Sequence, residues 1–365
     1  MNATKTDLMQ APEFSVIIVN YNGGDYICAA VRSLAAQTFR NFEVIVLDNA
    51  STDGSADKID FTGVPSAQLV RNADNLGFAA ANNLGAHMAT GRWLALLNPD
   101  AEAAPDWLEK IAAASRRHPD CRVFASAQYD MAHPDHIDGA GDAYLIFGLP
   151  WRGGFGHPAS HMPAEGECFS PCGAAAIYDR TLFLEHGGFD ERFFCYCEDV
   201  DLGFRMQLAD ERCIFLPDAI VHHMGSAITG KHSKFSAYHG TRNRIWTYAK
   251  NMPLLLLLLT LPVHIVLSIY LIFRNAFIGC FSATLRGTWD GLRKAMSIRR
   301  GTDWKTDPRK VPVWALSRTM AWNPHLLNSR AAHVRPVTGS KHVPSSNPNA
   351  EKEPPAQQTR VGKEA

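Results

Sequence analysis

Three short apolar runs, each followed by polar residues, constrain most strongly how this chain can fold. Residues 15–20 read SVIIVN, residues 42–47 read FEVIVL and residues 93–97 read WLALL. Runs of this length and composition are typical of strands buried on both faces of a parallel sheet. Between the first two runs, helical spacing gives one apolar face made of Ile27, Ala30, Val31, Leu34 and Ala35. Strand, helix and strand in this order predict an α/β fold with a Rossmann-like, mostly parallel sheet flanked by helices.

Polar residues at the ends of these runs indicate where a ligand would bind. The three runs end, in order, at Asn20 and Tyr21, at Asp48 and Asn49, and at Asn98 and Asp100. In open parallel α/β sheets, ligands bind at the carboxyl ends of the strands. We therefore expect these polar groups to meet in one crevice.

Weaker patterns divide the rest of the chain. Residues 68–70 predict a third strand and residues 82–88 lie in an alanine-rich helical stretch, whereas residues 120–165 indicate mobile or acceptor-facing loops. The predicted parts are a tail at 1–12, an α/β nucleotide-binding domain at 13–250, an apolar and basic helical region at 251–324, and a disordered tail at 325–365.

Composition excludes some classes of partner. The chain has 36 Lys and Arg against 36 Asp and Glu, so no global charge favours a nucleic-acid partner. The first residues carry no basic run before an apolar segment, and we expect a cytoplasmic domain without a secretory signal. Cys195 and Cys197 are two of eight cysteines, and they are interpreted as reduced, buried side chains in preference to metal ligands.

Two motifs are candidates for metal binding. Asn98-Pro99-Asp100 follows a buried strand, and a carboxylate there is placed to bind a hard divalent cation such as Mg²⁺ or Mn²⁺. His222 and His223 are adjacent, so their side chains point in different directions and only one of them is expected to act as a ligand. Each motif alone also has a structural explanation, a turn in the first case and a packed histidine in the second.

A third motif carries crowded carboxylates. Glu198, Asp199 and Asp201 follow one another closely, and crowding favours a raised pKa in one of them, as a general base requires. The other explanation is a helix N-terminus that places acids against the helix dipole.

Six stretches, in this order, resemble the motifs of family 2 glycosyltransferases. They read SVIIVNYNGGDYI, FEVIVLDNASTDGS, RNADNLGFAAANNLGA, WLALLNPDAE, GGFDERFFCYCEDVDLGFR and VHHMGSAITGKHS, and they lie within residues 14–250. They are most similar to the rhamnosyltransferase-like branch, which builds bacterial cell-surface polysaccharides. The resemblance implies a GT-A fold, a nucleoside diphosphate sugar donor with rhamnose as the best guess, and inversion at the sugar.

The resemblance also assigns roles to single residues. Nucleotide binding falls to Asn20, Tyr21, Asp48, Arg71 and Asn75, and contact with the diphosphate or acceptor falls to Arg242 and Asn243. Asp100 matches the metal-binding carboxylate of the DxD motif, in which Asn98 replaces the first acid, and His223 completes the metal site. Asp199, beside Glu198, matches the base that deprotonates the acceptor hydroxyl.

The run from Pro253 to Phe273 is long and apolar enough to span a bilayer. Both flanks are expected to be cytoplasmic, because the donor is made there and residues 274–310 are rich in Lys and Arg. A single span cannot satisfy both flanks, so an interfacial or re-entrant segment bent at Pro262 is favoured, at the cytoplasmic face of the inner membrane. A saccharide or lipid-linked acceptor would fit that location, and a buried helix is the remaining alternative.

Two other functions are compatible with an α/β nucleotide-binding fold. A catalytically silent nucleotide-sugar-binding scaffold is kept open by Asn98, although such a protein needs no base. A nucleotidyltransferase should carry a glycine-rich loop with Arg and Lys after its first strand, and Asn22-Gly23-Gly24 lacks those residues.

Overall fold

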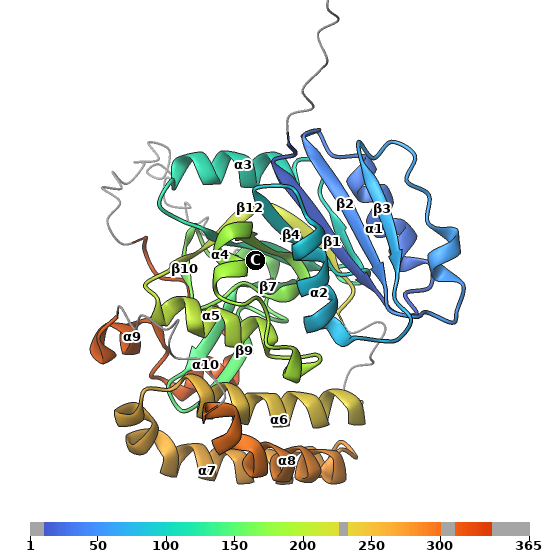
Figure 1. Cartoon of the computed structure of the whole chain (residues 1–365). Helices are drawn as coiled ribbons and strands as arrows, with labels where there is room; N and C mark the ends of the chain where they lie inside the picture. Colours follow the sequence, from blue (N-terminus) through green and yellow to red (C-terminus); the bar gives the residue numbers. More distant parts are fainter. Residues whose placement is uncertain (1–10, 226–232, 301–310, 338–365) are drawn as a thin grey trace, which may run out of the picture.

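A computed structural model describes residues 11–225, 233–300 and 311–337. Its centre is a mixed, mostly parallel sheet with the strand order β10-β12-β6-β11-β4-β1-β2-β3, with β5 and β7 pairing at β12 and β6 (Figure 1). The strands are β1 (Phe14–Asn20), β2 (Phe42–Asp48), β3 (Ala67–Arg71), β4 (Trp93–Leu96), β5 (Ala101–Ala103), β6 (Val123–Asp130), β7 (Ile137–Ala140), β10 (Gly166–Cys168), β11 (Ala176–Asp179) and β12 (Cys213–His223). β8 (Asp142–Leu145) and β9 (Leu149–Arg152) form a separate hairpin.

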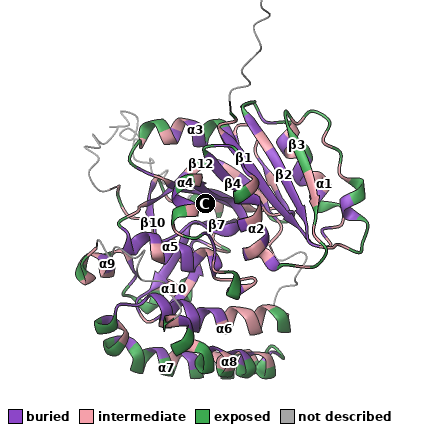
Figure 2. Cartoon of the chain, in the orientation of Figure 1, coloured by how far each residue is buried: buried purple, intermediate pink, exposed green. Residues whose placement is uncertain are grey.

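Helices cover both faces of the sheet. One face packs against α1 (Tyr26–Ala35) and α3 (Trp107–Arg117). The other packs against α2 (Gly77–Met88), α4 (Arg180–Glu185) and α5 (Glu198–Leu208). The central strands are buried on both sides (Figure 2), which explains their continuous apolar sequence. The predicted fold class is confirmed.

The register of the sheet brings the predicted strand ends together. β1 and β2 are parallel and pair Asn20 with Asp48, while β2 and β3 pair Asp48 with Arg71. β4 runs parallel to β1 on its other side. The carboxyl ends of β1, β2 and β4 therefore open at the same edge of the sheet.

Three long helices form a layer beneath the sheet domain in Figure 1. They are α6 (Lys234–Asn251), α7 (Leu254–Ala276) and α8 (Phe281–Arg300). α7 continues through Pro262 as one helix, so the expected re-entrant hairpin does not reverse at that proline. The chain instead turns between α7 and α8. α7 is the one described helix that is long and apolar enough to cross a membrane, by length and composition alone.

The C-terminal part is ordered further than the sequence indicated. Two short helices, α9 (Val313–Thr319) and α10 (Pro324–Ser329), follow the helical layer. Arg335 then pairs with Glu167 of β10 through two backbone hydrogen bonds of 2.7 and 2.8 Å. Disorder from residue 325 was therefore the wrong expectation for residues 325–337, because a pairing partner lies far away in the sequence. Residues 1–10 and 338–365 lie outside the described residues.

Candidate active site

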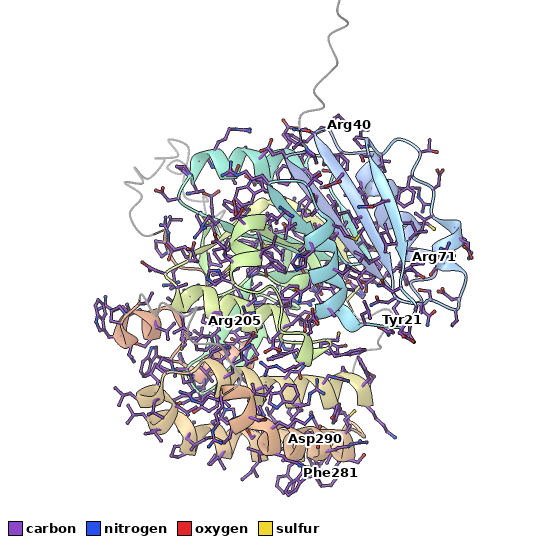
Figure 3. All side chains as sticks on the ribbon, viewed as in Figure 1. Tyr21, Arg40, Arg71, Arg205, Phe281 and Asp290 are labelled. Atoms are coloured by element: carbon purple, nitrogen blue, oxygen red, sulfur yellow. The ribbon has the colours of Figure 1, made fainter. Side chains whose placement is uncertain are left out.

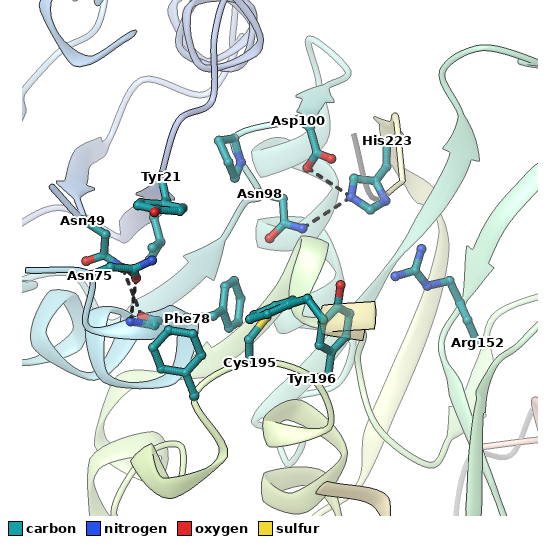
Figure 4. A pocket seen from close by; sticks show the side chains of 15 residues that line it. Tyr21, Asn49, Asn75, Phe78, Asn98, Asp100, Arg152, Cys195, Tyr196 and His223 are labelled. Carbon is teal, nitrogen blue, oxygen red and sulfur yellow. Dashed lines mark hydrogen bonds and ion pairs between the residues drawn. The ribbon is translucent and has the colours of Figure 1, made fainter. Parts of the chain in front are cut away.

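A cavity of about 550 Å³ opens at the carboxyl ends of β1, β2 and β4 (Figure 4). We call it the strand-end cavity. Its lining includes Tyr21, Asn49, Asn75, Asp100, Arg152 and His223. The predicted convergence of polar strand ends is thus found in the fold, and residues 120–165 contribute Arg152 to the same wall.

The predicted nucleotide-binding residues are divided between the cavity wall and the layer behind it. Tyr21 is 41% exposed and lines the cavity with Asn75. Asn20 is fully buried, and its amide donates to Asp48 Oδ1 at 2.8 Å, so this pair supports the loop behind the wall. Arg71 lies at the outer edge of the sheet (Figure 3), where it pairs with Asp57 at 2.6 Å.

Asn49 was expected in the crevice as a polar strand end, but the family resemblance assigned it no individual role. Its amide donates to the carbonyl of Gly77 at 3.1 Å and lies 3.3 Å from Asn75 Oδ1, while Asn72 donates to its oxygen at 2.8 Å. These bonds connect the end of β2 to the first turn of α2. Its place directly after Asp48 at a strand end was the available signal.

The two predicted metal ligands lie side by side at one end of the cavity. His223 Nε2 is 3.3 Å from Asp100 Oδ1, and the amide nitrogen of Asn98 is also 3.3 Å from Nε2. On the other side of the ring, Nδ1 is 2.8 Å from Asp138 Oδ2. His222 points to the opposite face of β12, where its ring lies 6.0 Å from that of Tyr129.

This group of side chains fits a divalent cation. Carboxylate oxygen and imidazole nitrogen are ligands for Mg²⁺-like and Mn²⁺-like ions, and a ligating histidine is usually oriented by a carboxylate on its other nitrogen, as Asp138 does here. Burial alone would lower the pKa of His223, but its hydrogen bonds to Asp100 and Asp138 outweigh burial and raise it. The same site therefore attracts positive charge.

A second cavity, of about 300 Å³, adjoins the first. We call it the Asp199 cavity, because Asp199 lines it together with Asp142, Cys172 and Glu198. Its wall shares Phe78, Asn98, Arg152, Cys195 and Tyr196 with the strand-end cavity. The predicted base and the predicted metal ligands thus face one continuous space from two sides.

Asp199 is held in place by backbone groups. It lies in the first turn of α5, where its Oδ2 accepts the Gly173 N–H and its Oδ1 the Val200 N–H, both at 2.8 Å. Burial raises the pKa of Asp199, although these two N–H groups oppose the increase. Burial and the neighbouring charge of Asp199 raise the pKa of Glu198 well above its usual value. Glu198 Oε2 is buried without a hydrogen-bond partner among the described residues.

Asp142 adds a further carboxyl group that sequence reasoning missed. Ligand atoms of Asp142, Cys172 and Asp199 all lie within 4.8 Å of one another, so this trio is a second place where a cation could bind. Burial, followed by the charge of Asp199, raises the pKa of Asp142 well above its usual value. Asp142 begins β8, in a stretch whose sequence showed no clear periodicity.

Asn243 and Arg242 support the loop that precedes Asp199. The buried amide of Asn243 donates to the carbonyls of Phe193, Cys195 and Tyr196 at 2.7–2.9 Å. Arg242 Nη2 donates to the Phe193 carbonyl at 2.9 Å. These two side chains hold the loop from behind, and neither lines a cavity.

The loop needs this support because its backbone is strained. Phe194, Tyr196 and Cys197 have φ values of 66°, 73° and 64°, a region that L-residues other than glycine rarely adopt. Asn243 satisfies three of the loop carbonyls and thereby stabilises this conformation. The loop presents Cys195 and Tyr196 to both cavities.

Comparison with known proteins identifies the family. Residues 15–186 match the family described as Glycosyl transferase family 2. The N-acetylglucosaminyl-diphospho-decaprenol L-rhamnosyltransferase of Mycobacterium tuberculosis (strains CDC 1551 / Oshkosh and H37Rv) is 30% identical over 255 residues, covering 61% of this chain and 80% of the relative. The O-antigen biosynthesis protein RfbC of Myxococcus xanthus is 28% identical over 58% of this chain and 17% of its own length.

The fold also occurs in a solved structure. GalNAc-T7, crystallised with UDP, GalNAc and Mn²⁺, superposes with a TM-score of 0.53 and 18% identity, over 65% of this chain and 47% of that chain. At this identity the likeness concerns the fold, which is that of the GT-A glycosyltransferases. Together with the family match and the mycobacterial relative, it shows that this chain belongs to glycosyltransferase family 2 and is an enzyme of the rhamnosyltransferase-like branch.

Proposed function

We propose that this enzyme transfers a sugar from a nucleoside diphosphate donor to a hydroxyl of a lipid-linked saccharide, with inversion, in the synthesis of a cell-surface polysaccharide. One observation supports the proposal: Asp199 lines one cavity, the pair Asp100–His223 lines another, and the two cavities adjoin through shared wall residues. In-line displacement needs a base and a leaving-group site in one connected space, and we propose that Asp199 acts on the sugar face opposite the leaving group. Rhamnose is the proposed sugar, since the mycobacterial relative is named for its transfer.

The strand-end cavity is the proposed donor site. Tyr21, Asn49 and Asn75 present an aromatic ring and amide groups suited to a base and ribose. Asn20 and Asp48 would act by fixing the loop behind Tyr21. For Arg71 we propose contact with the outer part of the nucleotide, which requires that its ion pair with Asp57 opens.

Asp100 and His223 are the proposed ligands of a Mg²⁺ or Mn²⁺ ion. Such an ion, when bound, offsets the negative charge that develops on the departing diphosphate. Asp138 would keep His223 oriented with Nε2 toward the ion. Mn²⁺ in the GalNAc-T7 structure motivates its use in the experiment below.

Asp199 is the proposed general base. An acceptor hydroxyl is a poor nucleophile, so a carboxylate within hydrogen-bond reach must take its proton as the bond to the sugar forms. The backbone N–H groups of Gly173 and Val200 fix the carboxylate. Burial and the charge of Asp199 raise the pKa of the neighbouring Glu198 well above its usual value, and we propose Asp199 as the member of the pair that accepts the proton.

The outer face of α7 and α8 is the proposed contact with a membrane surface. α7 exposes Leu255, Leu258, Leu259, Val266 and Phe273, and α8 exposes Leu285, Trp289, Leu292 and Met296. Exposed Arg274, Arg286, Arg293, Lys294 and Arg300 flank this face. An apolar face bordered by cations is suited to anionic headgroups. Figure 3 places Phe281 at the outer edge of this layer.

The inner face of α7 favours an interfacial position over a span. Thr260, His264 and Ser268 lie four residues apart and are buried. They contact Tyr248 at 2.7 Å, the Phe147 carbonyl at 2.8 Å and Arg244 at 3.2 Å, respectively. A helix that left this surface to cross the bilayer would have to break all three contacts. We therefore propose peripheral binding at the cytoplasmic face of the inner membrane.

Calorimetric titration with a panel of nucleoside diphosphate sugars, with and without Mn²⁺, tests the donor assignment. We expect Mn²⁺-dependent binding of one sugar nucleotide, with deoxythymidine-diphosphate rhamnose as the first candidate. A protein that binds none of the panel under either condition would contradict the proposed function.

A further inference from the structure

Arg152 occupies the junction of the two cavities. Among the described residues, it is the only arginine or lysine in the lining of either one. It ends β9, and Figure 4 shows its guanidinium group pointing into the space between His223 and Tyr196. No role followed for it from the sequence, because β9 belongs to the stretch that carries no recognisable motif.

The side chain is fixed from one side. Arg152 Nη1 donates to Asp138 Oδ2 at 2.6 Å, and Asp138 is 2% exposed. The aliphatic part of the side chain lies over Gly139, where a Cβ would come within 2.9 Å of Arg152 Cδ. A residue with a side chain at position 139 would therefore displace the guanidinium group.

The remaining guanidinium donors are available to a ligand. Within the described part of the chain, the Arg152 side chain makes no hydrogen bond or ion pair other than the one with Asp138, and 28% of that side chain is exposed. Asp142 and Asp199 lie in the same cavity, yet neither is within ion-pair distance of Arg152. The arginine is thus anchored by one nitrogen, with its other nitrogens unpaired.

We propose that Arg152 binds a phosphate group at the junction of the two cavities. A guanidinium group offers parallel N–H donors that match two phosphate oxygens, and it keeps its charge at any physiological pH. The inference rests on the proposed function, and the phosphate has two possible sources. One is the diphosphate of the donor, and the other is the diphosphate of a lipid-linked acceptor of the kind for which the mycobacterial relative is named.

Arg152→Gln and Arg152→Lys test the inference, with Arg116→Gln on the outer surface of α3 as the matched control. Calorimetry with deoxythymidine diphosphate and with uridine diphosphate, each with Mn²⁺, measures the Kd for the nucleoside diphosphate and tests whether Arg152 binds the donor. Initial rates with N-acetylglucosaminyl-diphospho-polyprenol and with a phosphate-free alkyl N-acetylglucosaminide give KM for each acceptor and test whether Arg152 binds the acceptor diphosphate. Melting temperatures are recorded for every variant. If Arg152→Gln unfolds, Arg152→Lys can still be tested, because it keeps a positive charge next to Asp138.

The two sources give different results. If Arg152 binds the donor, Kd for the nucleoside diphosphate rises about 10-fold or more in Arg152→Gln, with partial recovery in Arg152→Lys. If it binds the acceptor, KM rises by a similar factor for the diphosphate acceptor and stays unchanged for the phosphate-free one. Values within twofold of wild type in all these measurements, for folded variants, would overturn the inference. Failure of the wild type itself to bind any nucleotide would instead contradict the proposed function.

Discussion

The strand-end cavity and the Asp199 cavity adjoin each other, but they are built from different kinds of sequence. Much of the first is formed by residues that follow neighbouring parallel strands, such as Tyr21, Asn49 and Asp100. The second collects Asp142, Cys172 and Asp199 from a hairpin, a short turn and the first turn of α5. The sheet therefore positions the polar residues of the proposed donor site, whereas long-range packing positions Asp199 and the carboxyl groups around it.

The largest effect is expected at the Asp199 cavity. Asp199→Asn removes the proposed proton acceptor but keeps the shape of the side chain, so kcat should fall about 10²-fold to 10⁴-fold while donor affinity is retained. Glu198→Gln is the matched control, because it neutralises the adjacent acid and leaves the base. Steady-state rates give kcat and calorimetry gives the donor affinity of each variant. Turnover by Asp199→Asn at the wild-type rate would exclude Asp199 as the base.

At the strand-end cavity the opposite pattern is expected. Asp100→Ala removes a proposed metal ligand. Loss of a residue that only orients a metal ligand typically costs about 10-fold to 100-fold in metal affinity. Loss of Asp100 itself should therefore lower the Mn²⁺-dependent affinity for the donor by at least that factor. Asn98→Ala, which removes the neighbouring amide, should cost less. Calorimetry at several Mn²⁺ concentrations gives the comparison. Unchanged metal dependence in Asp100→Ala would place the ion elsewhere, with Asp142, Cys172 and Asp199 as the next site to test.

A substitution at Asn243, which lines neither cavity, should disturb the loop that forms the wall between them. Asn243→Ala removes one donor from each of three loop carbonyls, although the Phe193 carbonyl keeps the Arg242 side chain as a donor. Misplacement of the loop before Asp199 should lower kcat about 10-fold to 100-fold. Asn251→Ala on the same helix removes an equally buried amide, bonded to Asp201 at 2.7 Å, without touching the loop. Equal losses of kcat in both variants would make the role of Asn243 one of general stability.

The pH dependence should separate the base from an ordinary exposed carboxylate. Asp199 must be ionised to accept a proton, and burial raises its pKa. Activity should consequently be lost as pH falls through this raised pKa, at a higher pH than for an exposed aspartate. A pH profile of kcat in saturating Mn²⁺ measures the acid limb. An acid limb in the usual range of an exposed aspartate would contradict this environment for Asp199.

The smallest effect on chemistry is expected at the outer face of α7. Leu259→Asp and Val266→Asp place charges on exposed apolar positions, so affinity for anionic vesicles should fall about 10-fold per site, the scale of burying one such side chain. The rate with a water-soluble acceptor should not change. Tyr26→Asp, at an exposed aromatic on α1, is the control for surface charge. Vesicle binding unaffected by the α7 substitutions would argue against this face as the membrane contact.

The same contrast explains what the sequence could predict. Buried strands and the polar residues after them are local features, so β1, β2 and β4 were foreseeable from the residues themselves. That Asp100 and His223 would lie together followed from the family resemblance, because no local pattern links residues so far apart in the sequence. Arg152 and Asp138 were not, because β7 and β9 are four residues each and lack periodicity. Arg335 pairs with Glu167 across more than 160 residues, and no local pattern marks such a pairing. Arg242 and Asn243 were identified as important, but their contacts are with the loop before Asp199.

The central claim is that Asp199 deprotonates an acceptor which attacks the donor sugar directly. Nuclear magnetic resonance of the product formed by the wild type from a sugar nucleotide and a lipid-linked acceptor tests it most directly. The account predicts an anomeric configuration opposite to that of the donor. A product that retains the configuration of the donor would require an intermediate step and would contradict direct attack assisted by Asp199.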